Sequence, residues 1–132
     1  GGRLGQMLLK VEQIMHKTDE LPLCQPDTLM DEAIVIMTSK RMGCVGVVDK
    51  KNQLIGMITD GDLRRHLAEG VLGKTADTIM TPNPSTLHAD QLASEALGFL
   101  NARKITNIFV VERGSQKPIG LIHIHDLLKF GS

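Results

Sequence analysis

Hydrophobic and polar positions follow the same order twice along the chain. In the first copy a short apolar segment, 21–24, precedes a stretch from about 28 to 40 whose apolar residues recur at helical spacing. Two β-branched-rich runs of strand length follow, at 44–49 and 55–59, with a polar turn between them. A second helical stretch follows from Asp62. This pattern predicts the order strand, helix, strand, strand, helix.

The second copy repeats this order further along the chain. Gly56 and Gly120 lie 64 residues apart, as do Asp62 and Asp126. Asp90 is the expected N-cap of the first helix in this copy. Because a unit of about 60 residues buries little surface alone, the copies are expected to pack together about a pseudo-twofold axis and to form two related clefts. The predicted fold class is α/β (α+β), with two β-α-β-β-α repeats in one module.

Repeat boundaries follow from the segments that open each copy. Residues 11–15 and 76–80 both end in Ile-Met. We therefore expect a first repeat over 11–72 and a second over 73–132. Residues 1–10 are expected to form a linker with a short lead-in helix, because Leu4, Met7, Leu8 and Val11 recur at helical spacing.

Composition narrows the class of protein. The chain has 132 residues, 42% of them hydrophobic and 23% charged, which is typical of a globular domain. A net charge of zero argues against nucleic-acid and membrane partners, and 2% aromatic content leaves little for base stacking. Two cysteines, and no apolar run long enough to span a bilayer, indicate a cytoplasmic protein. The start at Gly1-Gly2 suggests a domain cut from a longer chain.

The corner after the strand that ends at Thr59 carries the candidate chemistry. Gly56 lacks a Cβ, so a ligand or a neighbouring strand can approach closely. Thr59 offers a hydroxyl, and the Asp62 carboxylate suits a vicinal diol such as a ribose. Arg64 and Arg65 are candidates to contact a phosphate. The alternative interpretation is an ordinary strand–turn–helix in which Asp62 is an N-cap.

The second corner differs in its polar groups. Asp126 is retained, but His123 stands where the hydroxyl is found in the first copy. His123 and His125 alternate on a strand and are expected to line the second cleft or to sit satisfied beside it, rather than to bind a metal. Either imidazole is able to titrate near neutrality. Cys44 and Asn107 begin equivalent strands and complete the candidate ligand contacts. For Cys44 a small packing role is the favoured interpretation.

Taken together, the order of elements, the Ile-Met openings and the motif Gly56-x-x-Thr59-x-x-Asp62 resemble a pair of CBS domains, also called a Bateman module. The resemblance covers about 11–128. In such modules the hydroxyl and the aspartate commonly hold a nucleotide ribose, which implies this role for Thr59 and Asp62. It implies a related role for His123 and Asp126. AMP or ATP is the implied regulatory ligand, and no cofactor is required.

Three stretches, 14–22, 59–65 and 123–128, are similar to the carboxy-terminal CBS pair of D-arabinose-5-phosphate isomerases. These bacterial enzymes interconvert ribulose 5-phosphate and arabinose 5-phosphate, and they serve the synthesis of Kdo for lipopolysaccharide. The resemblance implies a catalytic sugar-isomerase (SIS) domain before this chain, a homodimer through the CBS pair and a tetramer at full length. It suggests the nucleotide sugar CMP-Kdo as an alternative feedback ligand, with its sugar carboxylate facing an arginine.

Two other classes of function compete with nucleotide sensing. A pure assembly module would use the paired copies to hold catalytic domains together and would bind no ligand. An enzyme in its own right is disfavoured, because the sequence has no phosphate-binding loop, no Ser/His/Asp or Cys/His set and no paired carboxylates in evident register. We therefore expect no catalytic centre within this chain.

Overall fold

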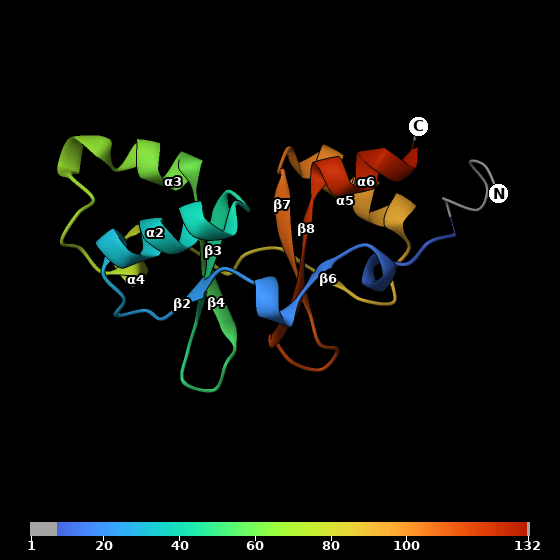
Figure 1. Ribbon diagram of the computed structural model, residues 1–132, viewed down its shortest axis with the longest axis horizontal. Helices are drawn as coiled ribbons and strands as arrows, with labels where there is room; N and C mark the ends of the chain where they lie inside the picture. The colour runs from blue at the N-terminus through green and yellow to red at the C-terminus, as the bar shows by residue number, and fades with distance from the viewer. Residues whose placement is uncertain (1–7, 132) are drawn as a thin grey trace. The chain divides into compact units, whose positions relative to one another are not determined.

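The computed structural model describes residues 8–131 and contains the predicted order of elements twice (Figure 1). The first copy comprises β2 (Leu23–Cys24), α2 (Met30–Lys40), β3 (Cys44–Val48), β4 (Leu54–Thr59) and α3 (Asp60–Arg65). The second comprises β6 (Thr86–His88), α5 (Ala93–Arg103), β7 (Asn107–Val111), β8 (Pro118–His123) and α6 (Ile124–Gly131). The predicted mixed α/β class, built from two β-α-β-β-α repeats, is confirmed.

Short elements open each copy. The opening segment of the first copy contains the 3-10 helix η1 (Val11–Gln13), strand β1 (His16–Lys17) and the 3-10 helix η2 (Thr18–Glu20). A third 3-10 helix, η3 (Leu67–Glu69), follows α3, and the opening segment of the second copy contains helix α4 (Ala76–Ile79) and strand β5 (Thr81–Pro82). The expected lead-in helix falls largely outside the described residues. Its described part, 8–10, is not helical, and Val11 begins only a single 3-10 turn.

The elements form two four-stranded sheets with the same internal pattern. In one sheet the strand order is β2-β3-β4-β5, with β2 parallel to β3 and the other pairs antiparallel. In the other sheet the order is β6-β7-β8-β1, with β6 parallel to β7. The central pairs align equivalent residues: Cys44 faces Thr59, and Asn107 faces His123. Each candidate corner therefore lies where two neighbouring strands meet a helix.

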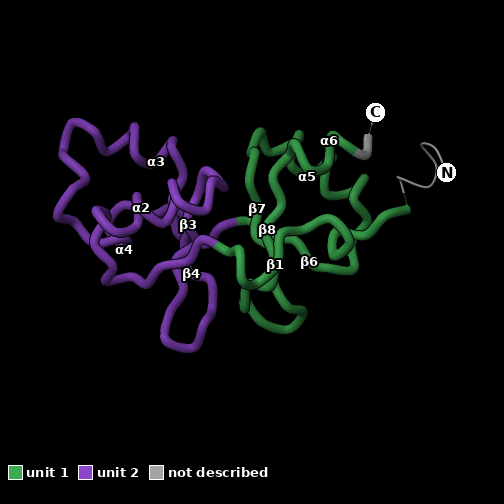
Figure 2. Tube along the Cα trace, in the orientation of Figure 1, with its two compact units in different colours: residues 1–21, 85–132 green, residues 22–84 purple. Residues whose placement is uncertain are grey.

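The chain divides into two compact units that do not follow the sequence repeats (Figure 2). Unit 2 comprises residues 22–84, and unit 1 combines residues 1–21 with 85–132. The reason is an exchange of leading segments: β1 pairs with β8 of the second copy, and β5 pairs with β4 of the first. The repeats expected over 11–72 and 73–132 are thus a different division of the chain from these units.

Each unit has a hydrophobic core of its own, and the exchanged segments contribute to both. In unit 1 the fully buried Val11 joins residues of β6, α5, β7, β8 and α6. In unit 2 the buried Ile79 of α4 packs with residues of β2, α2, β3 and β4. All five residues of β3 are buried, as its unbroken apolar run requires. Burial of Val11 and Ile79 ties each leading segment to its unit.

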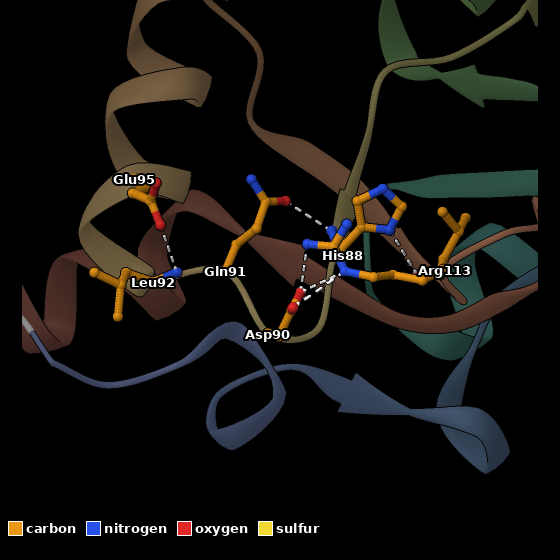
Figure 3. Close-up of polar contacts among 7 residues, drawn as sticks. His88, Asp90, Gln91, Leu92, Glu95 and Arg113 are labelled. Atoms are coloured by element: carbon orange, nitrogen blue, oxygen red, sulfur yellow. Dashed lines mark hydrogen bonds and ion pairs between the residues drawn. The ribbon is translucent and has the colours of Figure 1, made fainter.

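The start of α5 corrects one sequence-based expectation. Asp90 is not the N-cap of this helix, because its carboxylate binds the Arg113 guanidinium through three hydrogen bonds of 2.8 to 3.1 Å (Figure 3). This bidentate contact holds the pKa of Asp90 below its usual range. The N-cap is Leu92, whose backbone amide donates instead to Oε1 of Glu95 at 2.9 Å.

Candidate functional site

In unit 2 the Asp62 carboxylate lies buried at the corner between β4 and α3, where its side chain is 3% exposed. Oδ2 of Asp62 accepts hydrogen bonds from the backbone N and from Oγ1 of Thr59, at 2.8 and 3.3 Å. Thr59, not Asp62, is the N-cap residue of α3, and Asp62 occupies the third helical position. The Asp62 side chain therefore closes the turn from strand to helix.

Oδ1 of Asp62 is held from two other directions. Oγ1 of Thr81 in β5 donates to it at 2.6 Å, and Nη2 of Arg65 makes a short ion pair with it. The Arg65 side chain is itself 63% exposed, so its guanidinium covers the carboxylate from the solvent side. The Arg64 side chain is exposed and makes no hydrogen bond or ion pair within residues 8–131. Of the two candidate phosphate ligands, Arg64 is the one with its charge unpaired.

Cys44 faces Thr59 across the sheet, as expected for residues at one corner. The Cys44 side chain is fully buried, and burial together with the nearby Asp60 carboxylate raises the pKa of its thiol to about 12. The thiol is therefore neutral and unreactive at physiological pH. This environment fits the packing role that was the favoured interpretation of Cys44.

The equivalent corner in unit 1 joins β8 to α6. Oδ2 of Asp126 accepts a hydrogen bond from the backbone N of His123 at 2.9 Å, just as Asp62 accepts one from Thr59. Nε2 of His16 in β1 lies 3.1 Å from the same oxygen, and Nδ1 of His16 lies 3.9 Å from the Glu20 carboxylate. The Asp126 side chain is 16% exposed, so this carboxylate is nearer to solvent than its counterpart.

His123 ends β8 whereas His125 lies in the first turn of α6, so the two histidines do not alternate on one strand as predicted, although their rings lie side by side. Their ring centroids are 4.5 Å apart, and the backbone N of His125 donates to Nδ1 of His123 at 3.0 Å. Burial, together with the charges of His125 and His16, lowers the pKa of His123, and Asp126 opposes this effect. Within residues 8–131 no group of three or more His, Cys, Asp or Glu side chains is arranged to hold a metal ion.

Asn107 faces His123 across the sheet of unit 1, in the position that Cys44 has in unit 2. Its Oδ1 atom is buried and has no hydrogen-bond partner in the described part of the chain. A buried amide oxygen without a donor is uncommon and costs free energy. Asn107 is therefore a candidate acceptor for a donor group that residues 8–131 do not provide.

The partners Thr81 and His16 are the site residues that sequence reasoning did not identify. Each directly follows the methionine of an Ile-Met opening and contacts the aspartate of the other copy. The methionines lie against the strand glycines: a Cβ on Gly56 would lie 2.8 Å from Cγ of Met80. The repeated Ile-Met openings and strand glycines were visible in the sequence. The sequence did not show that the methionine of one copy packs against the glycine of the other.

Comparison with solved structures shows the fold that these corners belong to. The crystal structure of CBSX2 in complex with AMP, a CBS-pair protein of Arabidopsis thaliana, has a TM-score of 0.78 and 24% sequence identity, covering 91% of this chain and 93% of that one. The CBS domain pair of protein MJ0100, in complex with 5′-methylthioadenosine and S-adenosyl-L-methionine, has a TM-score of 0.82 and 23% identity, covering 92% of this chain and 94% of that one.

Sequence comparison finds closer relatives. An uncharacterized protein of Rickettsia prowazekii is 48% identical over 131 residues, and arabinose 5-phosphate isomerase KdsD of Pseudomonas aeruginosa is 40% identical over 134. KdsD of Escherichia coli is 35% identical over 134 residues. Each alignment covers 99% of this chain, but only 40% or 41% of the relative's length.

None of the helices between residues 8 and 131 is long and apolar enough to cross a lipid bilayer.

The CBS domain family matches residues 11–69 and 76–132, one match to each copy of the repeat. The chain is therefore a tandem pair of CBS domains and belongs to the CBS domain family.

Proposed function

We propose that this chain is the nucleotide-binding regulatory module of a bacterial arabinose-5-phosphate isomerase. The observation that carries the proposal is the repeated corner. In each copy an aspartate lies three residues after the last residue of a strand, and its carboxylate accepts a hydrogen bond from the backbone amide of that last residue. The similarity to KdsD proteins supports the isomerase assignment, and the AMP named for CBSX2 supports the class of ligand.

In this proposal the two carboxylates, Asp62 and Asp126, bind the vicinal hydroxyls of a ribose, because an ionised carboxylate only accepts hydrogen bonds. Thr59 and His123 line the corresponding corners. Arg64, exposed and unpaired within the described residues, is positioned on α3 to meet a phosphate, and Arg65 can do so only by leaving Asp62.

The ligand is an adenine nucleotide or the nucleotide sugar CMP-Kdo, whose ribose and anionic groups suit the same residues. In the whole protein an SIS catalytic domain would precede the CBS pair and would be regulated by it. That protein would be cytoplasmic and would associate through the CBS pair, as a dimer of modules and a tetramer at full length. Kdo and lipopolysaccharide synthesis is the pathway that such an isomerase would serve.

One observation favours a second candidate, an assembly module that binds no ligand. All hydrogen-bonding capacity of Asp62 is satisfied inside unit 2, as in a purely structural turn. In that case the aspartates stabilise the corners, and the pair serves only to associate chains.

Calorimetric unfolding with AMP, ATP, CMP and CMP-Kdo distinguishes the two candidates. A ligand at about 100 times its dissociation constant should add about 2.7 kcal/mol of stability, which raises Tm by several degrees. The double variant Asp62→Asn/Asp126→Asn, whose own Tm is measured without ligand, should lose that increase. An unchanged Tm of the parent chain with all four compounds would favour the assembly module.

A further inference from the structure

The two candidate carboxylates differ in how many of their acceptor positions the protein already uses. A carboxylate has about four lone-pair positions. Asp62 fills them all, with the backbone N and Oγ1 of Thr59 on one oxygen and Oγ1 of Thr81 and Nη2 of Arg65 on the other. Its side chain is 3% exposed. A ligand can reach this carboxylate only by displacing one of its partners.

Asp126 uses only one of its two oxygens. Oδ2 accepts from the backbone N of His123 at 2.9 Å and lies 3.1 Å from Nε2 of His16. Oδ1 has no hydrogen-bond partner within residues 8–131, and the Asp126 side chain is 16% exposed. The cause is the sequence difference at this corner: a histidine replaces each threonine, and the residue three positions after Asp126 is Lys129, which makes no ion pair with it within residues 8–131.

A second acceptor beside this corner is also unused. Asn107 faces His123 across the sheet, and its buried Oδ1 has no partner among the described residues. The residue in the equivalent position of unit 2 is Cys44, whose buried thiol presents no such acceptor. The unit 1 corner thus holds two acceptors that lack donors, whereas every acceptor position of the unit 2 carboxylate has a donor.

We infer that the two corners are not equivalent: the Asp126 corner binds the vicinal hydroxyls of a ribonucleotide directly, while Arg65 keeps the Asp62 corner closed. This inference rests on the proposed function and assigns the order in which its two sites are available. Arg65 is then a specificity-determining residue, because its guanidinium occupies the position on Asp62 that a diol would take. Removing that guanidinium should make the second site available.

The test is isothermal titration of the full 132-residue chain with AMP. We expect one AMP per chain, and about tenfold weaker binding of 2′-deoxy-AMP, which lacks one hydroxyl donor. Asp126→Asn should weaken AMP binding by about tenfold or more, whereas Asp62→Asn should leave it within about twofold. Arg65→Met should raise the stoichiometry to two, and so should Arg65→Lys, which gives the Asp62 corner the lysine that the Asp126 corner has at position 129.

Asp62→Asn removes a buried acceptor and can impair folding, so the Arg65 variants provide an independent test through an exposed side chain. Two AMP molecules per parent chain, or binding abolished by Asp62→Asn and kept by Asp126→Asn, would overturn the inference and leave the proposed function intact. A stoichiometry of one in Arg65→Met would also overturn it. No AMP binding by the parent chain or any variant would contradict both the inference and the proposed adenine-nucleotide function.

Discussion

At the scale of single residues, small differences between the copies change what equivalent carboxylates can do. Asp62 and Asp126 hold the same turn, since each accepts the backbone amide of the residue three positions earlier. Thr81 donates through a hydroxyl, whereas His16 contacts Asp126 through an imidazole. The two corners therefore share their backbone design but differ in the side chains that contact the aspartate.

His123 provides a test of the second corner. Its pKa is lowered in the folded chain, so folding favours the neutral imidazole, whose Nδ1 accepts the His125 amide. The stability that this group contributes is fully present above its unfolded pKa of about 6.5, and is lost as the pH falls below that value. We expect a lower Tm at pH 5.5 than at pH 7.5.

The matched variant is His123→Asn, because the Asn oxygen can accept from the same amide but does not titrate. It should retain the Tm of the parent chain at pH 7.5 and show a smaller decrease between the two pH values. An equal decrease in variant and parent would assign the pH dependence to other groups.

At the scale of elements, the exchanged leading segments hold each unit together. The Met that ends each Ile-Met opening lies against a glycine in the other copy's strand, Met80 on Gly56 and Met15 on Gly120. The sequence alone allowed either a ligand or a neighbouring strand close to Gly56, and in the structure the Met80 side chain takes that space. This contact explains why each copy contains both a strand glycine and the methionine of an Ile-Met opening.

Gly56→Ala tests this packing. Its added Cβ would approach Sδ and Cγ of Met80, so the variant should lose about 1–3 kcal/mol of unfolding free energy. Gly98→Ala is the control, since Gly98 is exposed within α5 and a Cβ there meets nothing within 4 Å. It should gain about 0.5–1 kcal/mol through helix propensity. Urea denaturation measures both; equal stability of Gly56→Ala and the parent chain would contradict the packing role.

The long elements were predictable from the sequence, whereas the short ones were not. Helices α2 and α5 and the central strand pairs follow from periodicity and β-branched runs. Strands β1 and β5 have two residues each, too few for any period to be detected. The predicted N-cap of α5 was wrong for a related reason. Asp90 is a residue type that suits an N-cap, but its carboxylate binds Arg113, which lies far along the chain.

At the scale of the whole chain, each compact unit contains residues of both sequence copies. The sequence identified Asp62 and Asp126 through their repeat, but the partners Thr81 and His16 are 19 and 110 residues away from them. Local spacing contains no information on such contacts, which depend on how the leading segments cross between copies. The aspartates of the candidate site were therefore predictable from the sequence, whereas the side chains of Thr81 and His16 that contact them were not.

The most direct test of nucleotide binding is a titration of the ¹⁵N-labelled chain with AMP, followed by amide chemical shifts. We expect saturable shifts of the amides at 123–126, at the corner where Asp126 has an unused oxygen. The equivalent amides at 59–62 should shift on the same titration only after Arg65→Met. Amides that remain unchanged at both corners, at AMP concentrations up to about 10 mM, would contradict the central claim that these corners bind a nucleotide.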